Sequence, residues 1–187
     1  VSRQWASHSF RGETRVTADN LDYCPACGTA LRDKQIEGRT RRYCPTCTEP
    51  VYQNPKPCAG VLVVDIQERV LLVKRTQPPA AGAWSVPAGY LEADEPPQQA
   101  AIRELQEETN LAVSMDDLQL FDTAFVRHPD GQHVLVVIYV APRAATTGAV
   151  APRSDAAAAQ FWALTEAFVP RFSTISGYAR QVSIAST

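Results

Sequence analysis

Four of the five cysteines stand in two pairs with the same internal spacing, CPAC and CPTC, and sixteen residues separate the pairs. The paired residues are Cys24, Cys27, Cys44 and Cys47. A two-residue gap lets both thiolates of a pair contact one ion, and four thiolates complete the tetrahedral shell of a structural Zn²⁺. The spacing therefore predicts a zinc ribbon over residues 21–52, preceded by a flexible tail over residues 1–20.

The same cysteines have two other interpretations. Disulfides suit an oxidising compartment, and a redox CxxC motif normally occurs once, beside a βαβ unit. The chain shows no signal-peptide pattern and the motif occurs twice, so we favour zinc and expect a cytoplasmic protein. Cys58 lies outside the pattern in a predicted strand, where we expect a small buried residue.

Charge divides unevenly along the chain. Residues 1–57 carry nine Lys and Arg against six Asp and Glu, a net +3, which leaves −5 for residues 58–187 because the whole chain is −2. Five of the cations lie between the cysteine pairs, where they could contact nucleic acid, the acidic domain or an anionic ligand. Tyr43 is the one aromatic residue there, so we expect a solvated hairpin and no nucleic-acid partner.

Residues 53–187 are expected to form the main domain. Residues 50–57, PVYQNPKP, hold three prolines and predict a stiff connector. Strands are predicted over residues 58–66, 69–75, 111–115, 118–128, 133–142 and 160–164, with helices over 97–109 and 173–182 and a long loop over 141–159. Hairpins outnumber repeated βαβ units, which favours an α/β sandwich around a mixed sheet. No apolar run reaches the ~20 residues of a membrane span, so we expect no membrane contact.

The segment from Gly89 to Leu111 contains six acidic residues and one arginine. On a helix, Glu104 and Glu108 are like charges at i and i+4, which cost a few tenths of a kcal/mol. A solvated acidic face is one interpretation. The other is a hard divalent cation such as Mg²⁺, which binds clustered carboxylates and is commonly shared with substrate phosphates.

This segment resembles the Nudix box of the Nudix hydrolase superfamily, Gly-x5-Glu-x7-Arg-Glu-U-x-Glu-Glu-x-Gly-U, where U is aliphatic. The matching residues are Gly89, Glu95, Arg103, Glu104, Leu105, Glu107, Glu108 and Leu111. Asn110 replaces the last glycine, at a helix C-cap where asparagine is the next best residue for a left-handed backbone. AWSVPAGYLE is similar to the lead-in of the family, and YQNPKP after a four-cysteine ribbon is similar to a zinc-bearing subgroup.

The resemblance implies an α/β/α sandwich around a mixed sheet and a catalytic Mg²⁺ (or Mn²⁺). Glu104 and Glu108 would be the main ligands, Glu107 a third ligand or the holder of a bound water, and the Gly89 carbonyl a further ligand. Arg103 would orient Glu107. Glu95 would brace the loop or a water, although a helix-dipole role explains Glu95 equally well.

A general base is harder to assign. Related enzymes take a glutamate from a loop outside the box, and Asp155 is the acid in the corresponding loop here. Asp155 is also an ordinary loop aspartate, and Glu92 is a second candidate base or metal-water ligand. We expect Arg75 and Trp84 to contact substrate, with core packing as the alternative for Trp84.

The resemblance implies Mg²⁺-dependent hydrolysis of the diphosphate in a small nucleoside diphosphate derivative, such as ADP-ribose, FAD or an NADH-like molecule. The product would be a nucleoside monophosphate, and the enzyme would be a homodimer with structural zinc. The alternative is a Nudix-fold sensor that binds such nucleotides without cleaving them and uses its ribbon to contact DNA or a protein.

Overall fold

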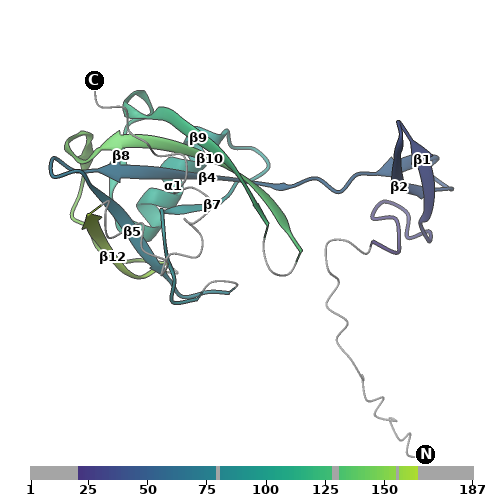
Figure 1. Cartoon of the computed structure of the whole chain (residues 1–187), viewed down its shortest axis with the longest axis horizontal. Helices are drawn as coiled ribbons and strands as arrows, with labels where there is room; N and C mark the ends of the chain where they lie inside the picture. Colours follow the sequence, from purple (N-terminus) through teal and green to yellow (C-terminus); the bar gives the residue numbers. More distant parts are fainter. Residues whose placement is uncertain (1–20, 79–80, 128–130, 155, 164–187) are drawn as a thin grey trace, which may run out of the picture. The chain divides into compact units, whose positions relative to one another are not determined.

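A computed structural model describes residues 21–78, 81–127, 131–154 and 156–163 of the chain (Figure 1). The chain divides into two compact units, with the boundary between Gln53 and Asn54. None of the helices in the described ranges is long and apolar enough to span a membrane.

The first unit is a small antiparallel sheet beside the four cysteines. Its strands are β1 (Arg32–Ile36), β2 (Arg39–Cys44) and β3 (Glu49–Val51), in the order β1-β2-β3. The turn between β1 and β2 uses positive φ at Glu37 and Gly38, so the expected hairpin is present. Its small core consists of Cys24, Leu31 and Cys44, with Leu21, Cys47 and Val51 packed against them.

The second unit contains a mixed sheet of seven strands within the described residues. Its main path is β12 (Ala156–Ala163), β5 (Arg69–Arg75), β4 (Lys56–Val64), β10 (His133–Pro142) and β9 (Gln119–Arg127). Two short strands lie off this path: β6 (Trp84–Ser85) pairs with β5, and β7 (Ala88–Tyr90) pairs with β4. β10 and β4 are parallel and the other pairs are antiparallel, which confirms the expected mixed sheet.

Helix α1 (Pro97–Thr109) lies against the sheet beside β4 and β7 (Figure 1). Proline in the first turn favours the start of the helix, because its missing N–H has no helical partner there. Asn110 ends the helix with φ 63°, ψ 14°, the left-handed C-cap expected from the sequence. Its side-chain Nδ2 donates to the Ala149 carbonyl 3.0 Å away, which holds a much later loop, around residue 149, to the helix end.

The main core lies between α1 and the sheet. Its fully buried members include Val61 and Val63 from β4, Leu71 from β5, and Leu105 from α1. A small two-stranded sheet of β8 (Ala112–Val113) and β11 (Thr146–Thr147) lies beside it, with 3-10 turns η1 (Met115–Asp117) and η2 (Arg143–Ala145). The apolar side of the helix and the central strands thus fix the position of α1 against β7.

The structure corrects several predicted boundaries; the strand expected over residues 111–115, for example, is only Ala112–Val113. The strand predicted from Gln160 begins at Ala156, within the predicted loop over 141–159, because these alanines pair with β5 although alanine is a weak strand former. The loop also contains η2 and β11. β4 begins at Lys56, so the stiff connector is shorter than expected. The predicted helix over 173–182 lies outside the described residues.

Candidate functional site

Arg103 is the centre of the acidic cluster on α1. Its guanidinium donates to the carboxylates of Glu95 at 2.5 and 3.1 Å, Glu104 at 2.7 Å, and Glu107 at 3.2 Å. A further bond of 3.1 Å reaches the Tyr90 carbonyl at the end of β7. The i to i+4 pair expected between Arg103 and Glu107 is therefore one contact of a larger network.

This network shifts the pKa of its members. The hydrogen bonds to Glu95 raise the pKa of Arg103 above its ordinary value, and the bonds from Arg103 and from the Glu92 amide lower the pKa of Glu95. The Glu92 amide donates to Glu95 Oε1 at 2.9 Å. Glu95 therefore binds both Arg103 and the backbone of the loop that precedes the helix. Glu95 lies just before the helix, whose first turn contains no acid.

The three box glutamates differ in burial. The Glu107 side chain is 50% exposed, that of Glu104 is 14% exposed, and Glu108 as a whole residue is 5% exposed. Helical periodicity puts all three on the side opposite Ile102 and Leu105, but Glu108 is nevertheless buried. The Ala88 amide at the start of β7 donates to Glu108 Oε2 at 3.1 Å, which explains how this carboxylate is accommodated inside.

Gly89 leaves the space that Glu104 occupies. A Cβ built on Gly89 would collide with the Glu104 carboxylate, although the backbone there does not have positive φ. The lack of a side chain at Gly89 lets the Glu104 carboxylate lie against the β7 backbone. The predicted metal ligands Glu104 and Gly89 are thus in direct proximity.

Cys58 lies in the same neighbourhood. Burial, with the negative charge of Glu104 and then Glu108, raises the pKa of this thiol to about 12, and Arg75 opposes the shift. The β4 residue Cys58 pairs with Tyr90 of β7. Three predicted site residues, Arg75, Glu104 and Glu108, thus act electrostatically on the Cys58 thiol, which is buried as expected.

The remaining predicted site residues lie elsewhere or are not described. Trp84 packs edge to face on Trp162, with ring centroids 5.1 Å apart, in a small cluster with Val70 and Leu72. Its surroundings favour the core-packing interpretation. Glu92 is exposed in the loop after β7, and Asp155 lies outside the described residues.

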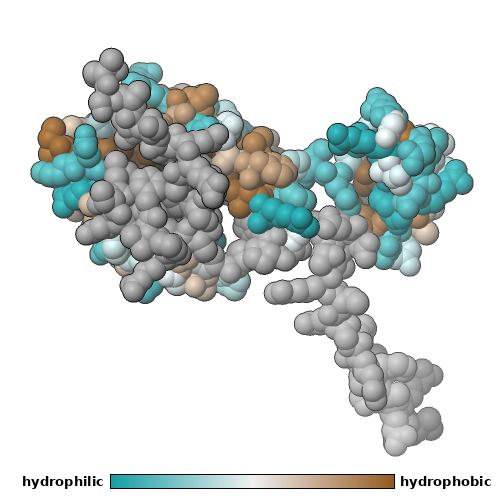
Figure 2. Space-filling view, in the orientation of Figure 1, coloured by the Kyte–Doolittle hydropathy of each residue, from teal (hydrophilic) through white to brown (hydrophobic). Residues whose placement is uncertain are grey.

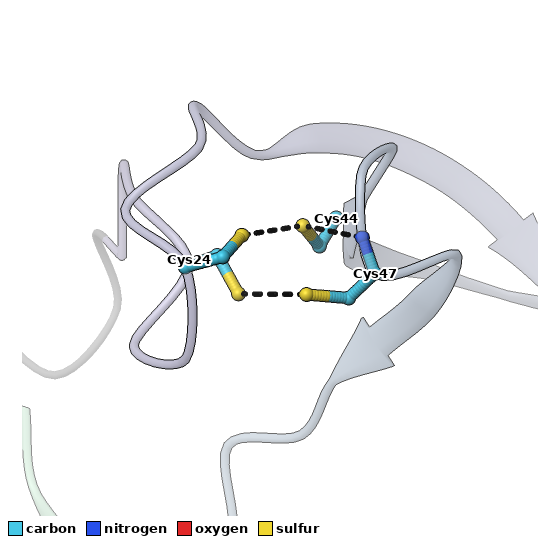
Figure 3. A group of neighbouring side chains, drawn as sticks. Cys24, Cys44 and Cys47 are labelled. Atoms are coloured by element: carbon cyan, nitrogen blue, oxygen red, sulfur yellow. Dashed lines mark hydrogen bonds between the residues drawn. The ribbon is translucent and has the colours of Figure 1, made fainter.

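The four paired cysteines form a site with the geometry of a metal centre (Figure 3). Their sulfur atoms all lie within 4.8 Å of one another, with Cys24–Cys47 at 3.9 Å and Cys27–Cys44 at 3.5 Å. Hydrogen bonding with Thr29 lowers the pKa of Cys27 to about 6, and hydrogen bonding with the neighbouring cysteines raises the pKa of Cys47 to about 12. Four sulfur donors at this spacing fit Zn²⁺.

The glutamates fit a different ion. Among the described residues, Glu104, Glu107 and Glu108 do not form a group as compact as the cysteines, because Arg103 engages the first two. Their carboxylates, together with the backbone of β7, are a set of hard oxygen donors, which suits Mg²⁺ or Mn²⁺ and not a thiophilic metal.

Known proteins share this combination of a mixed sheet and a helix whose glutamates are hydrogen-bonded to an arginine. The model of the NUDIX domain matches residues 54–180, so the chain belongs to the NUDIX family. A MutT NUDIX hydrolase from Burkholderia pseudomallei has a similar structure, with a TM-score of 0.61 and 27% identity, over 70% of this chain and 99% of that one.

Two curated relatives illustrate the range of similar proteins. The ADP-ribose pyrophosphatase of Methanocaldococcus jannaschii is 30% identical over 78 residues, covering 42% of this chain and 46% of the relative. The NAD-capped RNA hydrolase NudC of Stutzerimonas stutzeri is 33% identical over 91 residues, covering 49% of this chain and 32% of the relative. The chain spans less than half the length of the curated relatives it matches.

Proposed function

We propose that this protein hydrolyses the diphosphate of a small nucleoside diphosphate derivative with the help of Mg²⁺ or Mn²⁺. ADP-ribose, FAD and NADH-like molecules are the substrates we consider. The main supporting observation is the nearly buried carboxylate of Glu108, with Glu104 held against Gly89. A solvated acidic helix would have no need to bury a carboxylate, which costs free energy unless something pairs with it.

The residues have separate tasks in this proposal. Glu104 and Glu108 would hold the metal from one side of α1, with the Gly89 carbonyl beside them and Glu107 as a further ligand. A bound divalent ion supplies charge neutralisation at the diphosphate and lowers the pKa of a coordinated water. Arg103 orients Glu107 and Glu104, while Glu95 fixes Arg103 and the preceding loop.

The reaction is a hydrolysis without a redox step. The oxygen of water forms a bond to one phosphorus as the general base takes a proton from that water, and the bridging P–O bond breaks, so that the leaving phosphate monoester keeps the bridging oxygen. ADP-ribose would give AMP and ribose 5-phosphate. Asp155 or Glu92 would act as the general base, and Arg75 would contact the diphosphate.

The four-cysteine ribbon over residues 21–52 would bind structural Zn²⁺ in this protein, and residues 53–187 would carry the chemistry. We propose a homodimer in the cytoplasm. An exposed apolar group on β9 and β10 offers a surface for a second copy, with Leu120 65%, Phe125 64% and Leu135 41% exposed. The relative named ADP-ribose pyrophosphatase favours a small nucleotide as substrate. The relative named NAD-capped RNA hydrolase makes a nucleotide attached to RNA the second candidate substrate.

A panel of ADP-ribose, FAD and NADH tests the proposal. We expect release of AMP from at least one of them with Mg²⁺ or Mn²⁺, and none with a chelator or with Zn²⁺ alone. Tight binding of these nucleotides without any turnover would instead support the sensor. An Asp117→Asn variant provides a control, because it removes an exposed carboxylate in η1 and should turn over like the parent protein.

A further inference from the structure

The register of the ribbon sheet sorts its charges onto two faces. Arg32 pairs with Tyr43, Lys34 with Arg41, and Ile36 with Arg39, so these side chains share one face. The same alternation puts Asp33, Arg42 and Glu49 on the other face. Four of the five cations of the strands thus lie on one face, and both acids lie on the other face with Arg42.

The other face is already occupied within the first unit. It carries Cys44 and Val51, which pack in the small core with the remaining cysteines. Arg42 lies on this face and donates to Asp33 at 3.0 Å and to the Leu21 carbonyl at 2.9 Å. Arg42 is therefore a structural cation, whereas the opposite face carries four that are not needed for the core.

We call that opposite side the cationic face. It carries the cations Arg32, Lys34, Arg39 and Arg41, together with Ile36, Tyr43, Pro50 and Tyr52. No acid of β1, β2 or β3 lies on it, and Glu37 in the β1–β2 turn reaches Arg41 only at 4.0 Å, with 77% of its own side chain exposed. Figure 2 shows the surface of this unit as mainly hydrophilic.

The cationic face contains two tyrosines, of which Tyr43 is buried and Tyr52 is exposed. The Lys34 ammonium lies 4.0 Å from the centroid of the buried Tyr43 ring, and the Arg41 guanidinium carbon lies 4.8 Å from that of Tyr52. Tyr52 follows β3 and is 52% exposed. The sequence interval between the cysteine pairs contains one tyrosine, but the fold adds Tyr52 from beyond it, next to Arg41.

We propose that the cationic face binds single-stranded RNA. Positive charges spread over one face can bind successive phosphates of a nucleic-acid backbone. An exposed tyrosine beside a guanidinium group provides a surface on which unpaired bases can stack. A duplex hides its bases in the stack, and an acidic peptide would make no use of Tyr52. RNA is the nucleic acid that ordinarily presents unpaired bases. This surface is independent of the diphosphate site proposed above.

The test uses the full chain loaded with zinc and a labelled, unstructured oligoribonucleotide of about twelve nucleotides, which covers one binding platform. Binding is followed by fluorescence anisotropy over a series of salt concentrations. Lys34→Gln and Arg39→Gln each remove one positive charge from the cationic face. Gln35→Glu and Thr40→Glu are matched controls, because each changes the net charge equally at the adjacent residue on the other face.

We expect each cation variant to reduce the slope of log K against log salt by about 0.7, as for one lost phosphate contact on a single strand. The matched controls should keep the parent slope. Equal slopes in a cation variant and its control, at equal zinc content, would overturn the proposal.

The stacking contribution has its own pair of variants. Tyr52→Leu should weaken binding about tenfold, whereas Tyr52→Phe keeps the ring and should bind like the parent. An equal loss of RNA affinity in both variants would contradict base stacking on the Tyr52 ring. Competition identifies the partner: polyglutamate that displaces the probe as well as RNA would indicate an acidic protein, and a deoxyribose strand that binds more tightly would overturn the assignment to RNA.

Discussion

Glu108 combines burial with a position among other carboxylates. Glu108→Gln keeps the side-chain shape and an acceptor for the Ala88 amide but removes the charge that would hold Mg²⁺. We expect kcat to fall by several powers of ten, since the charge shielding of the diphosphate and the activation of water would fail together. The thermal midpoint without Mg²⁺ should be unchanged or slightly higher, because the repulsion with Glu104 disappears.

Steady-state kinetics and thermal unfolding, each with and without Mg²⁺, measure both effects. Near-normal turnover by a folded Glu108→Gln variant would contradict the proposed role of Glu108 as a ligand of the catalytic metal.

Gly89 offers a second test at this scale. Gly89→Ala needs no unusual backbone angle, so its effect comes from the collision of the new methyl group with the Glu104 carboxylate. We expect a modest loss of stability, because the Glu104 carboxylate must move away from the methyl group and from its bond with Arg103, and a weaker affinity for Mg²⁺ in turnover. Chemical denaturation and Mg²⁺ titration of the rate measure these quantities. A variant with parent stability and parent Mg²⁺ affinity would contradict the close approach of Glu104.

At the scale of elements, α1 was the most predictable part of the fold. Its bounds follow from the prolines at its start and the asparagine after Thr109, both local signals. The burial of Glu108 was not predictable from periodicity, because the short strand β7 covers that side of the helix and supplies the Ala88 amide. β12 was missed in part for a similar reason, since its alanines become a strand only by pairing with β5.

The C-cap of α1 gives a prediction about stability. Asn110→Ala should destabilise the protein by about 2 kcal/mol, because alanine tolerates the left-handed backbone less well than asparagine and the bond to the Ala149 carbonyl is lost. Asn110→Gly should cost less, since it loses only the side-chain bond. Chemical denaturation of both variants provides the comparison, and equal losses would mean that backbone conformation contributes little.

At the scale of the whole molecule, the metal content distinguishes the two proposed sites. The purified protein should contain about one equivalent of zinc per chain, held by the paired cysteines. No cysteine should react quickly with a thiol reagent at pH 8, because four are metal-bound and burial keeps Cys58, with its pKa of about 12, protonated. A chelator should release four reactive thiols, and Cys58 should react only after denaturation.

Elemental analysis and thiol titration test this outcome. Absence of zinc, together with four freely reactive thiols in the folded protein, would refute the metal site.

Removal of residues 1–48 separates the roles of the two units. We expect the remaining chain to lose stability more than its Mg²⁺-dependent turnover, because the glutamates and the exposed apolar group of β9 and β10 both lie in the second unit. Sedimentation, thermal unfolding and the rate at increasing Mg²⁺ provide the readouts. A shortened protein that stays folded and dimeric but no longer binds Mg²⁺ would contradict the division of tasks.

The left-handed backbone at Asn110 has a consequence for recognising relatives. A pattern that demands glycine at this position would reject the chain, although asparagine meets the same geometric requirement at φ 63° and adds a side-chain bond of its own. A sequence pattern that requires any residue suited to a left-handed backbone at this position would accept asparagine as well as glycine. Sequences discarded for this single mismatch then become candidates for the same chemistry.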